Sequence, residues 1–175
     1  MFNNLIIYSS TDGQTLTICN KISEVISVND DTTIISLEEA EGIDISLFKK
    51  IIIGASIRYG KHKPSLYKFI DKNNAELSAK KSAFFSVNVV ARKPEKNTPD
   101  TNPYMQKFLS LSSWKPSYLE VFAGKIDYPK YKFIDKHMIR FIMWMTKGPT
   151  DLKGTYEFTN WDSVDNFANK IGSID

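Results

Sequence analysis

Polar loops that directly follow apolar, β-like runs contain the residue types most able to bind an anionic ligand. The first such loop follows the run Leu5–Tyr8 and consists of Ser9, Ser10, Thr11, Asp12, Gly13, Gln14 and Thr15. A hydroxyl-rich turn with a glycine can surround an anion with backbone N–H groups, and a helix beginning there adds the positive end of its dipole. Ser, Thr and Asp are also common helix N-caps, so composition alone leaves phosphate binding and helix capping both open.

A second loop, after the run Ile51–Ala55, offers groups suited to a planar ring. It consists of Ser56, Ile57, Arg58, Tyr59 and Gly60. Ile57 and Tyr59 can provide apolar faces. Gly60 lets the backbone approach a ligand closely, and Arg58 can donate hydrogen bonds to a ring edge or to a carboxylate. Ordinary loop packing for Tyr59 and a solvated surface charge for Arg58 are the simpler alternatives.

A third loop, after the run Ala83–Val87, is both polar and basic. It begins with Val87, Asn88 and Val89, and a proline-broken stretch then carries the cations Arg92, Lys93 and Lys96. Taken alone, such a run of charges is usually a solvated face.

Apolar runs alternate with helical periodicities along the chain, which predicts a parallel sheet. Strands are expected at residues 5–8, 33–37, 51–55, 83–87 and 118–126. Helices are expected at residues 16–26, 64–70, 104–111, 131–147 and 161–171. Right-handed crossovers between parallel strands cover both faces of a sheet, and ligands then bind beyond the carboxyl ends of the strands. All three polar loops follow strands, so they are the places where we expect a ligand.

Composition bounds the class of protein. The 175 residues, 42% of them hydrophobic and 25% charged, suit one globular domain. One cysteine and two histidines, His62 and His137, offer neither an internal disulfide nor a zinc or Ser-His-Asp site, so no metal is expected. There is no apolar run long enough to span a membrane and no signal-peptide pattern, so a cytoplasmic location is expected.

Basic residues are concentrated in one third of the chain. The formal net charge is only +3, but residues 91–147 carry 11 lysines and arginines against five acidic residues. So mild an overall charge is weak support for nucleic acid, which we do not expect as a partner. The sequence also lacks a GxGxxG dinucleotide fingerprint and a Walker lysine.

The first loop resembles the phosphate loop of flavodoxins, because Ser10, Gly13 and Thr15 match the usual residues, whereas Asp12 replaces a threonine. A fuller resemblance, to the bacterial quinone-linked, oxygen-independent protoporphyrinogen IX dehydrogenases, extends over nearly the whole chain. It rests on DGQT at 12–15, GASIRYG at 54–60, SVNVVARKPEK at 86–96, YPKY at 128–131 and TNW at 159–161.

This resemblance implies one flavodoxin-like, doubly wound α/β domain over residues 1–175, with a five-stranded parallel sheet of order 2-1-3-4-5 and helices on both faces. A basic and apolar segment at about 128–150 would be specific to the family. The resemblance also implies FMN as the cofactor, bound by the three loops at residues 10–15, 56–60 and 87–89. The implied reaction, in haem biosynthesis, oxidises protoporphyrinogen IX to protoporphyrin IX and passes electrons to menaquinone or ubiquinone. Arg92, Lys93 and Lys96 would then meet the two propionates of the substrate, and no protein base is identifiable.

Two other functions stay open at this point. One is a flavodoxin-type electron carrier, although such carriers are typically acidic and this chain has a net charge of +3. The other is a quinone reductase fed by NAD(P)H, for which no second nucleotide fingerprint is visible.

The helix expected at residues 131–147 combines a basic face with many apolar side chains. Lys132, Lys136 and Arg140 recur at a spacing of four residues, while Phe141, Trp144 and others are apolar. Such a helix can lie in a membrane interface. Together with the lipid-soluble quinone that the resemblance implies, this would make the protein peripheral on the cytoplasmic face of the inner membrane. The alternative is a core helix that buries the same apolar face against the sheet.

Overall fold

The computed structural model describes residues 2–27 and 31–173. Its strands are β1 (Phe2–Ser9), β2 (Thr32–Ser36), β3 (Phe48–Ser56), β4 (Lys81–Val87), β5 (Tyr118–Phe122), β6 (Lys125–Asp127) and β7 (Thr155–Glu157). Its α-helices are α1 (Gln14–Ile26), α2 (Leu37–Ala40), α3 (Pro64–Lys72), α4 (Asn74–Ala79), α5 (Pro103–Leu111), α6 (Phe133–Met145) and α7 (Trp161–Gly172).

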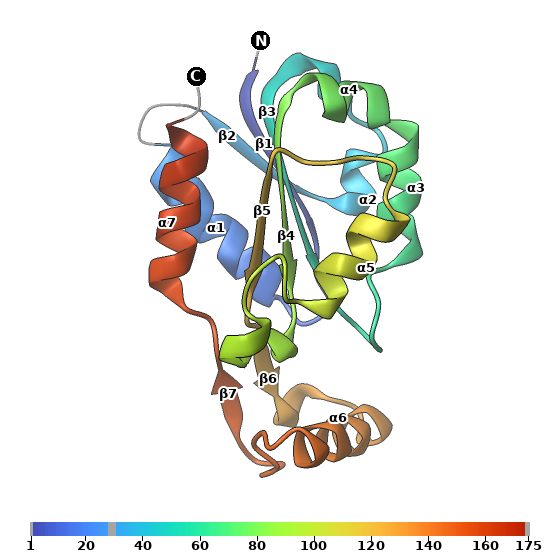
Figure 1. Ribbon diagram of the computed structural model, residues 1–175, viewed down its shortest axis with the longest axis vertical. Coiled ribbons are helices and arrows are strands. Elements are labelled where there is room, and N and C mark those ends of the chain that lie inside the picture. The colour runs from blue at the N-terminus through green and yellow to red at the C-terminus, as the bar shows by residue number, and fades with distance from the viewer. Residues whose placement is uncertain (1, 28–30, 174–175) are drawn as a thin grey trace.

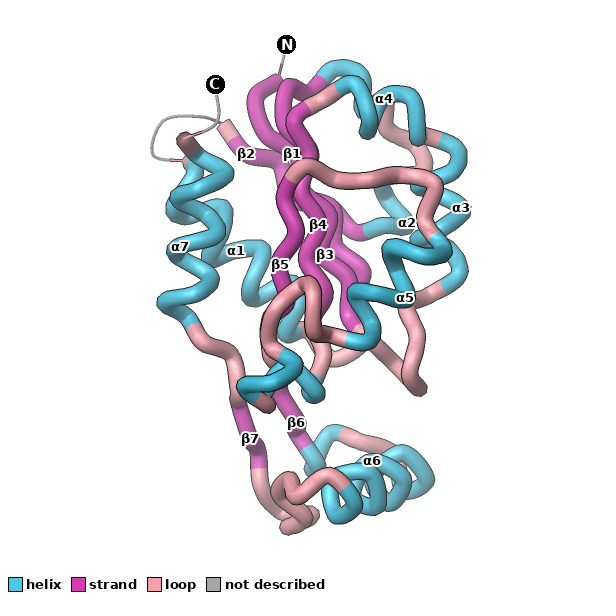
Figure 2. The backbone as a smooth tube through the Cα atoms, in the orientation of Figure 1, coloured by secondary structure: helices cyan, strands magenta, loops and turns pink. Residues whose placement is uncertain are grey.

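Five strands form one parallel sheet in the order β2-β1-β3-β4-β5, which confirms the predicted order 2-1-3-4-5. At its centre, Ile6 of β1 lies between Ile34 of β2 and Ile52 of β3. The central strands are almost continuously apolar because helices cover both of their faces. Figure 2 shows these strands running side by side toward one end of the molecule, where their carboxyl ends meet.

Helices pack on both faces of the main sheet (Figure 1). On one face, Ile18 of α1 and Phe167 of α7 pack with Phe85 of β4. On the other face, Phe108 of α5 stacks on Phe84 with ring centroids 3.8 Å apart. Neighbouring residues of β4 therefore serve opposite cores, as the two-residue alternation of a strand requires.

The fifth strand is shorter than the predicted range 118–126. β5 ends at Phe122, and the chain leaves the main sheet through Gly124. The last residues of the predicted range belong to β6, which pairs antiparallel with β7 and places Lys125 opposite Glu157. The prediction was wrong here because a continuous apolar pattern indicates burial but not pairing. Within residues 118–126 the partner strand changes from β4, which pairs with β5, to β7, which pairs with β6.

β6, α6 and β7 form a small unit below the carboxyl ends of the main strands (Figure 1). It has its own core, which contains the buried residues Ile126, Tyr128 and Met143. The predicted helix at 131–147 is α6, but Met143 is its only buried residue. Phe133 is 78% exposed and Trp144 is 68% exposed, so the alternative of a core helix packed on the sheet is wrong. None of the helices within the described residues is long and apolar enough to cross a membrane.

Candidate functional site

The three polar loops meet at the carboxyl edge of the main sheet. Together with α6 they line a cavity of about 440 Å³. The predicted site residues on its wall are Ser10, Thr11, Asp12, Gln14, Thr15, Ser56, Ile57, Arg58, Tyr59, Gly60, Val87, Asn88 and Val89. Among the residues predicted to bind the cofactor, only Gly13 does not line it. The three loops selected by the strand-end rule therefore border one cavity, and their binding of a ligand stays a prediction.

The first loop has backbone donors that suit an anion. Gly13 adopts a left-handed φ of 89° at the N-cap of α1, and no side chain caps the helix there. The Ser10 hydroxyl instead accepts a hydrogen bond of 3.0 Å from the Gly13 N–H. The N–H groups of Gln14 and Thr15 open α1, so helix geometry provides no carbonyl partner for them. Free donors at a helix N-terminus are a favourable place for a phosphate.

Thr15 supplies the sharpest sign that this loop awaits a ligand. Its hydroxyl oxygen is buried and has no hydrogen-bond partner within the described part of the chain. A buried hydroxyl without a partner costs free energy, and a phosphate oxygen on the cavity side would satisfy it. The donors of this loop therefore fit the phosphate of a flavin nucleotide.

Arg58, on the cavity wall, forms ion pairs with two carboxylates from separate elements. Its guanidinium donates to Asp12 Oδ2 at 3.2 Å and to Asp135 Oδ2 on α6 at 3.0 Å. The Tyr59 hydroxyl also donates to Asp135, and this bond together with Arg58 holds the pKa of that carboxyl below its usual range. Burial raises the pKa of Asp12, an effect that nearby Arg58 only partly offsets. The guanidinium of Arg58 is thus already engaged by protein carboxylates, which neutralise it at the cavity wall.

A tight turn presents the second loop to the cavity. Arg58 and Lys61 exchange backbone hydrogen bonds of 3.0 and 3.2 Å, and the turn between them uses left-handed φ angles of 50° at Tyr59 and 73° at Gly60. A positive φ is sterically unfavourable for a non-glycine residue such as Tyr59. Contacts of the Tyr59 side chain must therefore stabilise the turn. Tyr59 is 59% exposed, and its contact with Asp135 ties the loop to α6.

The third loop is fixed from both sides. The Ile57 N–H donates to the Val87 carbonyl at 2.9 Å, and the Asn88 N–H donates to the Phe122 carbonyl at 3.0 Å. Val87, Asn88 and Val89 therefore leave β4 in one defined direction along the cavity. Apolar side chains with ordered backbone around them suit the face and edge of an isoalloxazine ring.

The basic cluster lies beside the cavity and does not line it. Arg92 donates to the carbonyl oxygens of Val89 and Thr146 at 3.1 and 2.8 Å and to the Thr146 hydroxyl at 2.9 Å. Its guanidinium therefore joins the third loop to the residue that follows α6. Lys93 and Lys96 are partly exposed and form no ion pair within the described residues.

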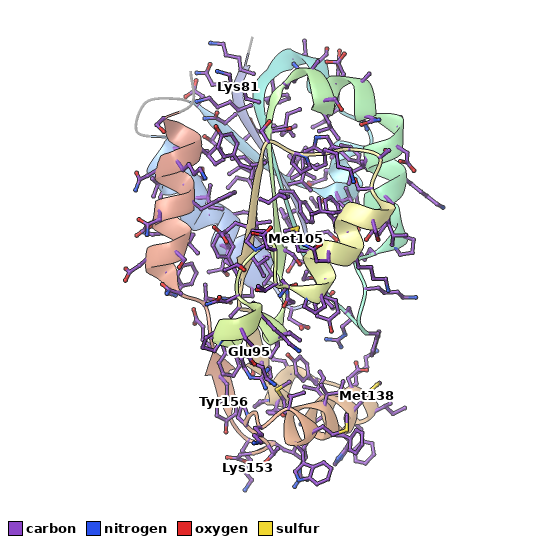
Figure 3. All side chains as sticks on the ribbon, in the orientation of Figure 1. Lys81, Glu95, Met105, Met138, Lys153 and Tyr156 are labelled. Atoms are coloured by element: carbon purple, nitrogen blue, oxygen red, sulfur yellow. The ribbon has the colours of Figure 1, made fainter. Side chains whose placement is uncertain are left out.

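Several residues of the cavity wall were not predicted. They are Val90, Tyr104, Gly124, Lys125, Ile126, Tyr131, Met138, Ile139, Ile142 and Met143. Tyr131 belongs to the YPKY segment at 128–131, to which the sequence alone assigns no role. The α6 residues at 138, 139, 142 and 143 follow a helical spacing, so one face of α6 covers the cavity. Figure 3 shows Met138 on this helix, below the strand ends.

The described residues contain no group of three or more His, Cys, Asp or Glu side chains placed to hold a metal ion. The arrangement consists of a loop with free backbone donors beside a largely apolar chamber. Such a site can bind a phosphorylated planar cofactor and exclude water from one side of it, but it shows no nucleophile paired with a base.

A model of the flavodoxin domain matches residues 5–153. The chain therefore belongs to the flavodoxin family, a class of flavin-binding α/β domains. Curated relatives narrow this class further. The relative from Escherichia coli K12 is named protoporphyrinogen IX dehydrogenase (quinone) and is 40% identical over 171 residues, which are 97% of this chain and 94% of the relative. A relative of the same name from Leishmania major is 40% identical over 174 residues, covering 97% of this chain and 74% of the relative.

Solved structures agree on the fold. A short-chain flavodoxin associated with a bacterial microcompartment aligns with a TM-score of 0.54 at 10% identity, covering 98% of this chain and 97% of that one. Megasphaera elsdenii flavodoxin aligns with a TM-score of 0.50 at 15% identity, covering 67% of this chain and 84% of that one. At such low identity the likeness concerns the fold alone.

Proposed function

We propose that this protein is an FMN-dependent protoporphyrinogen IX dehydrogenase of haem biosynthesis that passes electrons to a quinone. The 40% identity with relatives of that name over 97% of the chain supports the reaction. The observation that carries the cofactor is the Thr15 hydroxyl on the cavity wall, which is buried and has no hydrogen-bond partner within the described residues. One phosphate loop, without a second one, favours FMN over FAD.

Different side chains would contact the phosphate and the ring of the cofactor. Bound FMN supplies the two-electron redox chemistry. Thr15 and the first N–H groups of α1 hold its phosphate, while Ile57 and Val89 border the ring. The inner face of α6, with Ile139 and Ile142, excludes water from the chamber in which the ring would lie. Exclusion of water protects a reduced flavin and an easily oxidised substrate from side reactions.

The cations near the cavity are suited to the substrate's propionates. Lys125 lines the cavity and, like Lys93 and Lys96, forms no ion pair within the described residues. Arg92, in contrast, donates to the Val89 carbonyl and to Thr146, so we expect it to act by holding the third loop against the end of α6. This differs from a direct contact between Arg92 and a propionate.

The outer face of α6 would bring the site to the membrane. Phe133, Ile134, Phe141, Trp144 and Met145 are all exposed there. The cations in and beside this helix are Lys130, Lys132, Lys136, Arg140 and Lys147. Each contributes about 1 kcal/mol near an anionic bilayer, and the apolar side chains add burial. Peripheral attachment on the cytoplasmic face of the inner membrane would place the cavity near menaquinone or ubiquinone in the bilayer.

Anaerobic reduction of the FMN-loaded protein tests the reaction. Protoporphyrinogen IX should bleach the flavin absorption rapidly, NADPH should not, and a soluble quinone should restore it. Rapid bleaching by NADPH alone would identify a quinone reductase. Reduction by neither compound, with free exchange of electrons with a redox partner protein, would identify an electron carrier.

Vesicle flotation tests the membrane location separately. The protein should float with vesicles of phosphatidylglycerol and phosphatidylcholine but not with pure phosphatidylcholine, and K136E/R140E should abolish flotation. K68E/K72E is the matched control, because it reverses two exposed lysines at the same spacing on α3. Equal loss in both variants, or no flotation of the unmodified protein, would overturn the membrane proposal.

A further inference from the structure

Four buried polar side chains lie together where β4 delivers the chain to the cavity. They are His62, Ser86, Asn88 and Asn102, with exposed fractions of 3%, 0%, 4% and 0%. They come from separate segments: the turn before α3, the end of β4 and the residue before α5. Buried polar groups are costly unless they are hydrogen-bonded, so their clustering needs a physical reason.

Direct hydrogen bonds join all four side chains into one network. His62 Nε2 and Ser86 Oγ share a hydrogen bond of 3.1 Å. The Asn88 amide donates to Ser86 Oγ at 3.3 Å and to Asn102 Oδ1 at 3.4 Å. Asn102 donates back to Asn88 Oδ1 at 3.1 Å. No polar side-chain atom of these four residues is both buried and unpartnered.

The network also holds the backbone of the third loop. Asn88 Oδ1 accepts from the Ala91 N–H at 3.0 Å, and Asn102 donates to the Lys96 carbonyl at 2.8 Å. Asn102 Oδ1 accepts from the N–H groups of Tyr104 and Met105 and so caps α5. The whole stretch from Asn88 to Lys96 is thereby tied to the end of one strand and the start of one helix.

Aromatic packing fixes the orientation of His62, the network member furthest from Asn102. The imidazole of His62 lies edge-to-face against Phe84 and Phe108, with centroids 5.6 and 5.9 Å away. Burial, with a smaller contribution from Lys107, lowers the pKa of His62 to about 4. The ring is therefore neutral near pH 7, and its hydrogen bond with Ser86 does not change with protonation in that range.

Only part of this hydrogen-bond network reaches the cavity wall. Asn88 and Val89 line the cavity, whereas His62, Ser86 and Asn102 do not. We propose that His62, Ser86 and Asn102 are positioning residues that act through Asn88 to hold the third loop against the flavin ring. This inference rests on the proposed binding of FMN.

A pair of serines on the same strand provides the test. Ser82 and Ser86 lie on the same face of β4, both are buried, and each hydroxyl makes hydrogen bonds. Ser82, however, lies at the opposite end of the strand, where it contacts Leu77 and Trp114. S82A and S86A should therefore lose similar stability in the apoprotein.

Only S86A should change the flavin site. We expect FMN to dissociate about fivefold or more readily from S86A, because removing one partner leaves a buried group unsatisfied. Riboflavin, which lacks the phosphate, should weaken by the same factor, and the visible absorption bands of the bound flavin should shift. S82A should match the unmodified protein in all three readouts. Identical flavin affinity and spectra in S86A and S82A would overturn the inference.

A double-mutant cycle tests whether the members act as one network. H62F keeps an aromatic ring among Phe84 and Phe108 but removes the nitrogen that contacts Ser86. The H62F/S86A double variant should bind flavin no more weakly than the weaker single variant, since both remove the same hydrogen bond. Fully additive losses would show that the two residues act separately. If the unmodified protein failed to bind FMN at all, the proposed function would fail instead, so the two failures are distinguishable.

Discussion

Thr15 carries a hydroxyl that is buried without a partner in the described chain, so it is more useful to a ligand than to the apoprotein. T15V should leave the apoprotein as stable as before, or raise its free energy of unfolding by up to about 1 kcal/mol. The same change should weaken FMN binding by about tenfold to a hundredfold, because a hydrogen bond to a charged phosphate is worth about 1.5–3 kcal/mol. Fluorescence titration and chemical denaturation measure the two effects.

Riboflavin separates the phosphate from the ring in this experiment. Its affinity should be the same in T15V and in the unmodified protein. T17V provides a matched control, because the Thr17 hydroxyl already donates to the Gly13 carbonyl at 3.2 Å and does not line the cavity. Weaker riboflavin binding in T15V would contradict the assignment of Thr15 to the phosphate.

His62 makes the stability of the fold depend on pH. Its pKa falls from 6.5 to about 4 in the folded protein because of burial. The unfolded chain therefore takes up a proton before the folded protein does, and stability contributed by neutral His62 is lost as pH falls from 6.5 to 4. The total loss is about 3 kcal/mol. Urea denaturation across this range should show H62F losing less stability than the unmodified protein, with parallel curves above pH 7; equal slopes below pH 6.5 would contradict this.

The residues of the three loops could be found from the sequence because each directly follows a strand. The role of Arg58 could not, because its partner Asp135 lies on a helix 77 residues further along the chain. A lone aspartate among the cations of that helix looks like part of a solvated face. For a similar reason, nothing local in the sequence shows that Arg92 donates to Thr146, which lies 54 residues further along the chain, and the assignment of Arg92 to the substrate stays a prediction.

At the scale of elements, α6 is held over the cavity at both ends. Asp135 in its first turn contacts Arg58 and Tyr59, and Thr146 after its last turn contacts Arg92. D135N should loosen the first of these attachments and expose the chain around α6. Limited trypsin digestion of the apoprotein should then cleave within residues 130–140 several times faster than in the unmodified protein.

Asp162 provides the matched control for D135N, because removing its charge affects a helix N-terminus without breaking an ion pair. It lies in the first turn of α7, as Asp135 does in α6, but forms no ion pair within the described residues. D162N should leave the cleavage rate near residues 130–140 unchanged. Equal cleavage in D135N and D162N would mean that Asp135 does not hold α6 in place.

Sequence periodicity located the elements of the main sheet but not the change of partner after β5. β7 has only three residues, too few for a strand pattern, and β6 continues the apolar run of β5. For α6, periodicity showed an amphipathic helix but not which face was covered. Its apolar residues surround much of the helix, and the cavity takes one face while another stays exposed.

At the scale of the whole molecule, the described residues form two large cores, one on each face of the main sheet, and a third, much smaller core in the unit of β6, α6 and β7. Many buried side chains surround the main sheet, whereas three buried residues hold the unit of β6, α6 and β7. The small unit should therefore open at a lower free energy than the sheet. Native-state hydrogen exchange should show the amides of α6 exchanging well before those of β1, β3 and β4.

Bound FMN should reduce the difference in opening free energy between α6 and the main sheet. The reason is that α6 forms part of the cavity wall, so only the form with α6 in place offers the complete site. Equal exchange free energies for α6 and the sheet in the apoprotein would mean that the chain opens as one cooperative unit.

The Gly124 carbonyl accepts a hydrogen bond of 3.0 Å from the Phe158 N–H, so the chain leaves the main domain and returns to it at nearly the same point. Everything between these two residues is an excursion whose removal would leave the sheet, α1 and α7 connected. The protein is in this sense modular: the three loops at the strand ends form one wall of the cavity, and residues of the excursion form the other. Grafting residues 125–157 onto a plain flavodoxin at the equivalent strand end should therefore transfer the α6 wall of the cavity and leave the three loops of the recipient unchanged.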